Sequence, residues 1–171
     1  MKLLLALFSY LSIGWSAAAV AAMVMVKRDT RRRMVRVFIT GCTVILGAAF
    51  FLFGTDKIIG WDSSAAHAET MAFYKTYYGL SPPFMVLTGW IQTVSAVLLI
   101  WHRRHWAAAA GAGLIFCTCS AALYFHLAYD PAGPFRGLPS IMGALLSAVV
   151  LLGNRDLAYS LFKTCLHRIR G

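Results

Sequence analysis

Charged residues are scarce in this chain of 171 residues: they make up 13% of the sequence, and only six of them are acidic. About a quarter of the residues in a soluble domain are charged, so this chain has too few polar side chains to cover a soluble globule. The 60% share of apolar residues also excludes an intrinsically disordered or fibrous chain. A helical membrane protein with several spans remains.

The sequence also lacks a nucleotide-binding loop, a zinc-protease motif and a serine-nucleophile elbow. Cys117 and Cys119 stand two residues apart, so on a helix they point in directions about 200° apart. They cannot close an ordinary disulfide or hold one metal ion, and a buried cysteine is usually a small apolar filler. We expect no metal site and no catalytic activity of the chain's own.

Five apolar stretches suit membrane-spanning helices, which need about 20 apolar residues each. They cover residues 3–26, 37–53, 83–101, 106–129 and 138–153. No 18-residue window within them contains an acidic or basic residue, and this argues against an ion-coupled transporter. The expected fold is all-α: a polytopic four-helix bundle preceded by one N-terminal transmembrane helix.

The basic residues predict how these spans are oriented. Twelve of the sixteen Lys and Arg residues fall in the connection 27–36, in the connection 102–105 and after residue 153. Positive residues stay on the cytoplasmic side, so we expect the N-terminus outside and the C-terminus inside, in a bacterial-type inner membrane. The net charge of +10 then serves orientation and contact with anionic lipids, and we expect no nucleic-acid partner.

Three regions follow from this layout. Residues 1–35 form an uncleaved N-terminal transmembrane helix and a basic cytoplasmic loop, although the apolar start also resembles a signal peptide. Residues 36–153 form the four-helix bundle. Residues 154–171 form a basic amphipathic tail on the inner surface.

The long outer connection predicts a short helix over residues 67–78 that lies on the membrane surface. Gly79 can end this helix, and Ser81 followed by Pro82 is typical of the start of the next helix.

Four polar side chains on the outer side are candidate ligand-binding residues. Gln92 lies within a span, where an amide must be hydrogen-bonded, so it either joins helices or contacts a bound head group. Lys57, next to Asp56, either forms an interfacial ion pair or lines the mouth of an outward site. His126 is expected to be hydrogen-bonded at a pocket mouth. Tyr78 is a further candidate on the same side. A haem would need a second axial ligand at similar depth, which argues against haem.

Small residues recur in two spans, at four-residue spacing in the first. In the first span they allow close approach of another helix, either from a partner subunit or from the chain's own bundle. These candidate partner-contact residues are Gly14, Ala18 and Ala22. In the second span, Gly47 and Gly54 indicate a packing seam.

Residues 36–153 resemble the DoxX/DoxD-like family of small four-helix membrane proteins. The resemblance rests on Arg36, on the Gly, aromatic and Lys pattern of residues 47–57, on the Gly-Leu-Ser-Pro element in 78–82, and on His126. Gln92 stands where the family has Glu. The resemblance implies a membrane bundle associated with redox systems, including thiosulfate-to-quinone oxidation.

We expect the chain to be an accessory or structural subunit of a larger, redox-linked membrane complex, with lipids and other membrane subunits as its partners. The alternative is a quinone- or lipid-binding component of a membrane oxidoreductase, so quinone is the cofactor to consider. A weaker alternative is a small-molecule transporter or channel.

Overall fold

The computed structural model describes residues 2–25, 28–60, 64–101, 105–130 and 137–154 of the chain. The described residues form six helices and contain no strand. They are α1 (Lys2–Met25), α2 (Arg28–Ile59), α3 (Ser64–Tyr78), α4 (Pro82–Ile100), α5 (His105–Tyr129) and α6 (Leu138–Gly153). This confirms the all-α prediction. The predicted tail lies outside the described residues from residue 155 onward.

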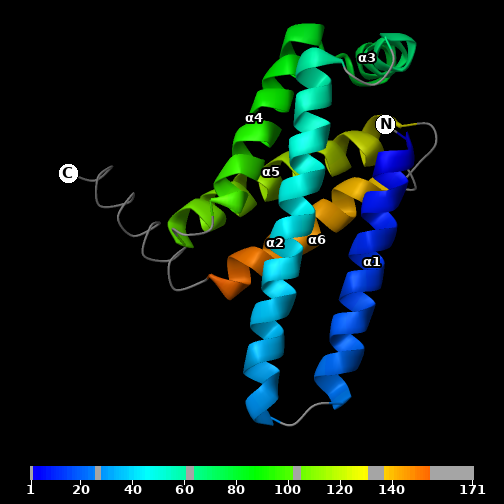
Figure 1. The fold of residues 1–171 in the computed structure, drawn as a ribbon. Helices are drawn as coiled ribbons and strands as arrows, with labels where there is room; N and C mark the ends of the chain where they lie inside the picture. The colour runs from blue at the N-terminus through cyan, green and yellow to red at the C-terminus, as the bar shows by residue number, and fades with distance from the viewer. Residues whose placement is uncertain (1, 26–27, 61–63, 102–104, 131–136, 155–171) are drawn as a thin grey trace.

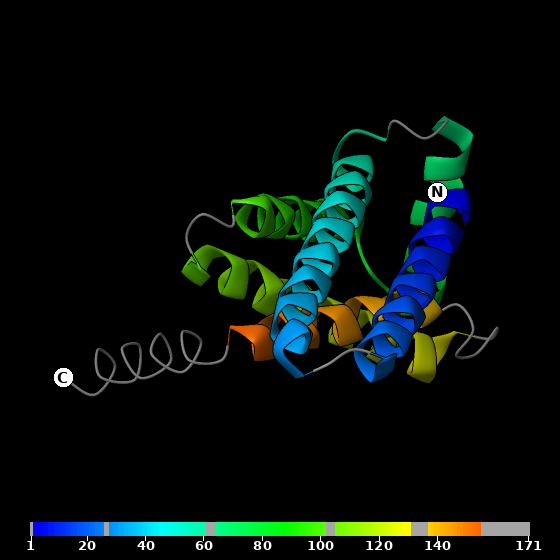
Figure 2. The same cartoon turned by 60° about the horizontal axis from the view of Figure 1, so that its bottom comes forward.

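The long helices alternate in direction, as short connections between neighbouring helices require. Helices α1 and α2 lie side by side as an antiparallel pair, and α5 and α6 cross this pair obliquely (Figures 1 and 2). The most extensive helix contacts join α2 to α4 and α5 to α6. The C-terminal end of α2, the N-terminal end of α4 and the C-terminal end of α5 therefore meet at one end of the bundle, which we call the α3 end because α3 lies there (Figure 1).

Three described helices contain apolar stretches long enough to cross a membrane: Arg33–Ile59, Pro82–Ile100 and Trp106–Tyr129. The apolar parts of α1 and α6 are shorter, at Ala6–Ala21 and Leu138–Gly153. Large apolar side chains such as Val94 and Ile100 are exposed, as expected for a surface that faces lipid. The chain is a multi-pass membrane protein.

Helix α2 is longer at both ends than the sequence predicted. The basic segment after residue 27 was expected to be a loop, but residues 28–36 form the first turns of α2. Arg and Lys are good helix formers, and hydropathy detects the apolar part of a helix rather than its hydrogen-bonded length.

The same helix also continues past Phe53, so Asp56 and Lys57 are helical residues inside a candidate span. Asp56 is only 3% exposed. The sequence argument against an ion-coupled transporter assumed that the spans contain no charged residue. Asp56 and Lys57 contradict that assumption.

The predicted glycine seam on α2 is confirmed. A methyl group on Gly54 would lie 2.7 Å from the carbonyl oxygen of Gly89, and a methyl group on Gly47 would lie 2.9 Å from Ile100. Glycine lets α2 and α4 approach this closely because it has no Cβ. The seam sets the spacing of the two helices at the α3 end.

Serines in the core let other helices pack closely without leaving a polar group unsatisfied. Ser12, Ser95 and Ser147 are fully buried. Each hydroxyl donates a hydrogen bond to the carbonyl oxygen four residues earlier in its own helix, at 2.6 to 2.7 Å. Because burial of an unpaired hydroxyl is costly, this pattern makes small polar residues acceptable inside the bundle.

The turn between α3 and α4 has the predicted form. Gly79 has φ +65°, a left-handed conformation that ends α3 and that glycine adopts readily. Ser81 is the N-cap of α4 in extended conformation, with proline in the first turn, but its side chain makes no capping hydrogen bond. The turn thus places Tyr78 at the last residue of α3.

Candidate functional site

Two polar clusters lie at the α3 end of the bundle. The first, which we call the Lys57 cluster, joins α2 to α4. The Lys57 Nζ donates a hydrogen bond to Gln92 Oε1 at 3.0 Å. Gln92 is 8% exposed, so it faces the bundle interior as the sequence predicted, and the bond satisfies its carbonyl oxygen. The glycine seam brings the two helices close enough for this contact.

The surroundings of Lys57 contain two further ionisable groups. Its ammonium lies within electrostatic range of Asp56 and of Cys119 on α5. Cys119 is 3% exposed, and a methyl group on Gly143 of α6 would lie 2.5 Å from its Sγ. The thiol therefore fills the contact between α5 and α6. Because Cys119 belongs to α5, its thiol adds a third helix, beside α2 and α4, to the surroundings of Lys57.

The second cluster, which we call the Tyr78 cluster, joins α3 to α5. The Tyr78 hydroxyl donates to Asp130 Oδ2 at 3.2 Å and lies 2.7 Å from Nδ1 of His126. His126 Nδ1 and Asp130 Oδ2 are also 3.2 Å apart. Because a phenol has one proton, a hydroxyl that donates to Asp130 accepts from the N–H on Nδ1.

Burial makes these interactions strong. The side chain of Asp130 has no exposed surface, and that of His126 is 13% exposed. Aromatic rings enclose the cluster: the centroids of Phe125 and Tyr74 lie 5.6 and 5.5 Å from that of Tyr78. Burial raises the pKa of the Tyr74 phenol, and the negative charge of Asp130 acts in the same direction.

The structure brings the four predicted ligand-binding residues together in pairs. Lys57 bonds to Gln92, and Tyr78 bonds to His126. Asp130 was not predicted as a site residue, although its position four residues after His126 places both on one helix face. Cys119 was predicted as an apolar filler, and its proximity to Lys57 could not be read from the spacing.

The predicted partner-contact residues lie on α1. Gly14 is exposed, and a methyl group there would meet nothing within 4 Å. Ala18 is also exposed, and the side chain of Ala22 lies outside the described part. Helix α1 packs on the bundle through another face, which includes Phe8 and Ser12. In the part of the chain that the structure describes, no group of three or more metal-ligating residues could hold a metal ion.

The family model of methylamine utilisation protein MauE matches the chain over residues 35–134. No curated protein and no solved structure matches significantly. The matched family differs from the DoxX/DoxD-like family that the sequence resembles, but both consist of small polytopic membrane proteins. The match runs from the first third of α2 past Asp130 and includes every residue of both polar clusters. The chain belongs to the MauE family.

Proposed function

We propose that this chain is an accessory membrane subunit in a redox-linked system for the utilisation of methylamine or a similar amine. The family match supports the link to methylamine utilisation. The observation that carries the accessory role is that both buried polar clusters hold helices together. The Lys57 cluster joins α2 to α4, and the Tyr78 cluster joins α3 to α5. In each cluster the side chains bond to one another across a helix contact, as in a scaffold.

The exposed side of α1 supports a role in assembly. Helix α1 lies outside the matched range 35–134, and the space around Gly14 is open. A small residue on an exposed helix face lets a second transmembrane helix approach closely. The partner we propose for this face is a helix of another membrane subunit.

Growth of the source organism tests this role. Deletion of the chain should abolish growth on methylamine as the sole nitrogen source and leave growth on ammonium unchanged. The wild-type chain and Val20→Phe should restore growth on methylamine, whereas Gly14→Leu should not, because Val20 lies about 120° away from Gly14 around α1, outside the proposed contact. Both positions are exposed on α1, so neither change disturbs the bundle. Equal growth on methylamine with and without the chain would refute the proposal.

A second candidate function is the binding of a quinone or lipid head group at the Lys57 cluster. A lysine ammonium has three donors, and Gln92 accepts one of them. A quinone carbonyl oxygen is an acceptor of the right kind for another donor. Organic extracts of the purified chain should then contain quinone. The extracted amount should fall in Gln92→Leu and remain in Thr118→Val, a control on the exposed side of α5.

A further inference from the structure

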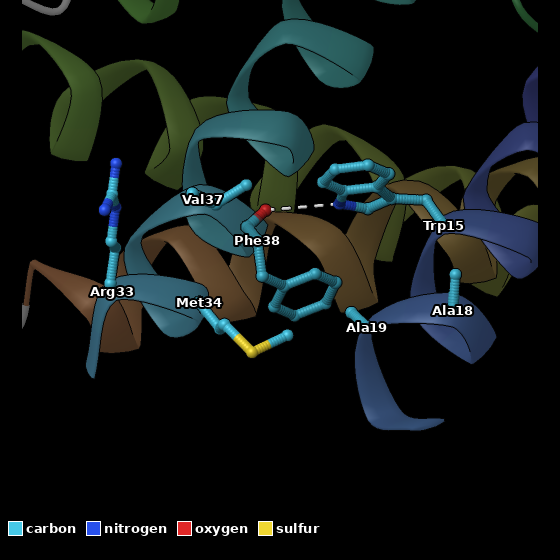
Figure 3. Close-up of a pocket in the computed structure, with 7 residues that line it drawn as sticks. All are labelled: Trp15, Ala18, Ala19, Arg33, Met34, Val37 and Phe38. Carbon is cyan, nitrogen blue, oxygen red and sulfur yellow. Dashed lines mark hydrogen bonds between the residues drawn. The ribbon is translucent and has the colours of Figure 1, made fainter. Parts of the chain in front are cut away.

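A groove runs between α1 and α2, away from both polar clusters. It forms a cavity of about 300 Å³. Figure 3 shows Met34 and Phe38 of α2 facing Ala19 of α1, with Ala18 beside it on α1 and Arg33 at the opposite edge of the view. The remaining lining residues are Trp15 and Val37.

A second, more open depression extends this groove along α2. It shares Trp15, Arg33 and Val37 with the cavity, and Arg36 also lines it. Together they form one continuous recess that is open to the surface, which we call the α1–α2 groove.

The wall of the groove is held in place by Trp15. Its indole Nε1 donates a hydrogen bond to the carbonyl oxygen of Phe38 at 3.2 Å. The two rings are stacked with centroids 6.4 Å apart and an interplanar angle of 19°. The indole also covers Gly41, where a Cβ would collide with it. The apolar surface of the groove is therefore formed before any ligand binds.

Two cations stand beside this apolar surface. Arg33 and Arg36 are three residues apart on α2, so their side chains are neighbours on the helix surface, and both are exposed. A guanidinium group binds a phosphate through paired hydrogen bonds. Basic pockets between transmembrane helices bind anionic lipid head groups. The groove thus combines an apolar channel with a phosphate-binding rim.

We propose that the α1–α2 groove binds an anionic phospholipid, with one acyl chain against Trp15 and Phe38 and the phosphate against Arg33 and Arg36. The chemistry of the lining favours an anionic lipid over a protein partner. Trp15 and Phe38 offer an apolar wall that suits an acyl chain. The paired cations Arg33 and Arg36 match the negative charge of a phosphate.

Native mass spectrometry of the full chain in mild detergent tests this proposal. The probes are phosphatidylglycerol and phosphatidylcholine with identical acyl chains, and soluble glycerol 3-phosphate. Phosphatidylglycerol should bind with one retained molecule per chain and should be preferred to phosphatidylcholine. The soluble phosphate should not displace it, because the acyl chain supplies part of the affinity.

The arginine variants locate the head group. One basic residue near a membrane surface contributes about a fivefold change in affinity, so Arg33→Gln with Arg36→Gln should weaken phosphatidylglycerol binding about 25-fold. Phosphatidylcholine also has a phosphate, but its choline offsets that negative charge, so its binding should weaken less than that of phosphatidylglycerol. Lys75→Gln is the control, because it removes an exposed positive charge from α3, at the other end of the bundle. Equal losses in the arginine and lysine variants would refute a defined site.

Filling the groove locates the acyl chain. Ala18→Phe places a ring in the recess and should abolish retention of the lipid, whereas Ala17→Phe, on an exposed neighbouring face of α1, should not. Circular dichroism before the titration verifies that each variant is helical. Retention of the lipid in Ala18→Phe, or its displacement by glycerol 3-phosphate, would overturn the acyl-chain part of the proposal. Equal affinity for the two phospholipids would overturn the whole proposal.

Discussion

The contact between Gly54 and Gly89 gives a sharp prediction, because it sets the distance between α2 and α4. A methyl group on Gly89 would lie 2.8 Å from the carbonyl oxygen of Gly54 and 2.9 Å from Lys57 Cβ. The carbonyl is backbone and cannot rotate away, so Gly89→Ala must push the two helices apart. Separation of the helices would also lengthen the hydrogen bond between Lys57 and Gln92.

The expected magnitude follows from two opposed effects. Overpacking a close contact costs about 1–3 kcal/mol, whereas alanine gains about 1 kcal/mol over glycine in helix propensity. The net loss for Gly89→Ala is therefore about 0–2 kcal/mol. Gly113→Ala is the matched control, because a methyl group on Gly113 of α5 would meet nothing within 4 Å and only the propensity gain remains.

Thermal unfolding followed by circular dichroism in detergent measures the difference. For a chain of this size, 1 kcal/mol corresponds to about 2–4 °C in Tm. Gly89→Ala should therefore melt about 6 °C below Gly113→Ala, with the wild type between them. If Gly89→Ala melts at or above the temperature of Gly113→Ala, the close approach of α2 and α4 is not present in the protein.

Three further predictions concern single side chains. Tyr78→Phe removes the hydroxyl between His126 and Asp130 and should destabilise the chain by about 1–3 kcal/mol, with faster proteolysis within α3. Trp15→Phe removes the donor to Phe38 and should cost about 0.5–1.5 kcal/mol in thermal unfolding. For Tyr74, burial raises the phenol pKa from its ordinary value of 10.0. Above about pH 10 the unfolded chain loses this proton first, so stability should fall as pH rises. In Tyr74→Phe the fall should be smaller in a pH series of melting curves.

The helices could be predicted well from the sequence where local chemistry determines them. Gly79 and Pro82 define the end of α3 and the start of α4 because each restricts or permits particular backbone angles. The extra length of α2 was missed, because hydropathy does not distinguish a basic loop from a basic helical turn. Residues 28–36 form basic helical turns of this kind at the start of α2.

The candidate site was predicted in part. Lys57, Gln92, Tyr78 and His126 were chosen because each is a polar group near the same membrane face, and the structure does bring them together in two pairs. The pairing itself depends on which helices are neighbours, and this could not be derived from spacing. Asp130 was missed because it follows the end of α5, where an acidic residue ordinarily meets water.

The α1–α2 groove could not be predicted from the sequence. Trp15 and Phe38 belong to different helices, and their stacking depends on how these helices cross. Gly41 was not singled out, because its role is visible only when the indole of Trp15 lies over it. Features formed between distant segments require the tertiary structure.

The most direct test of the proposed accessory role is native mass spectrometry of the chain purified in mild detergent from its native membrane. The proposed role predicts a stoichiometric membrane partner that is lost in Gly14→Leu and retained in Val20→Phe, a change on an exposed side of α1 away from Gly14. A chain that purifies alone from every mild detergent, particularly one that carries bound quinone, would contradict the accessory role and favour the ligand-binding alternative.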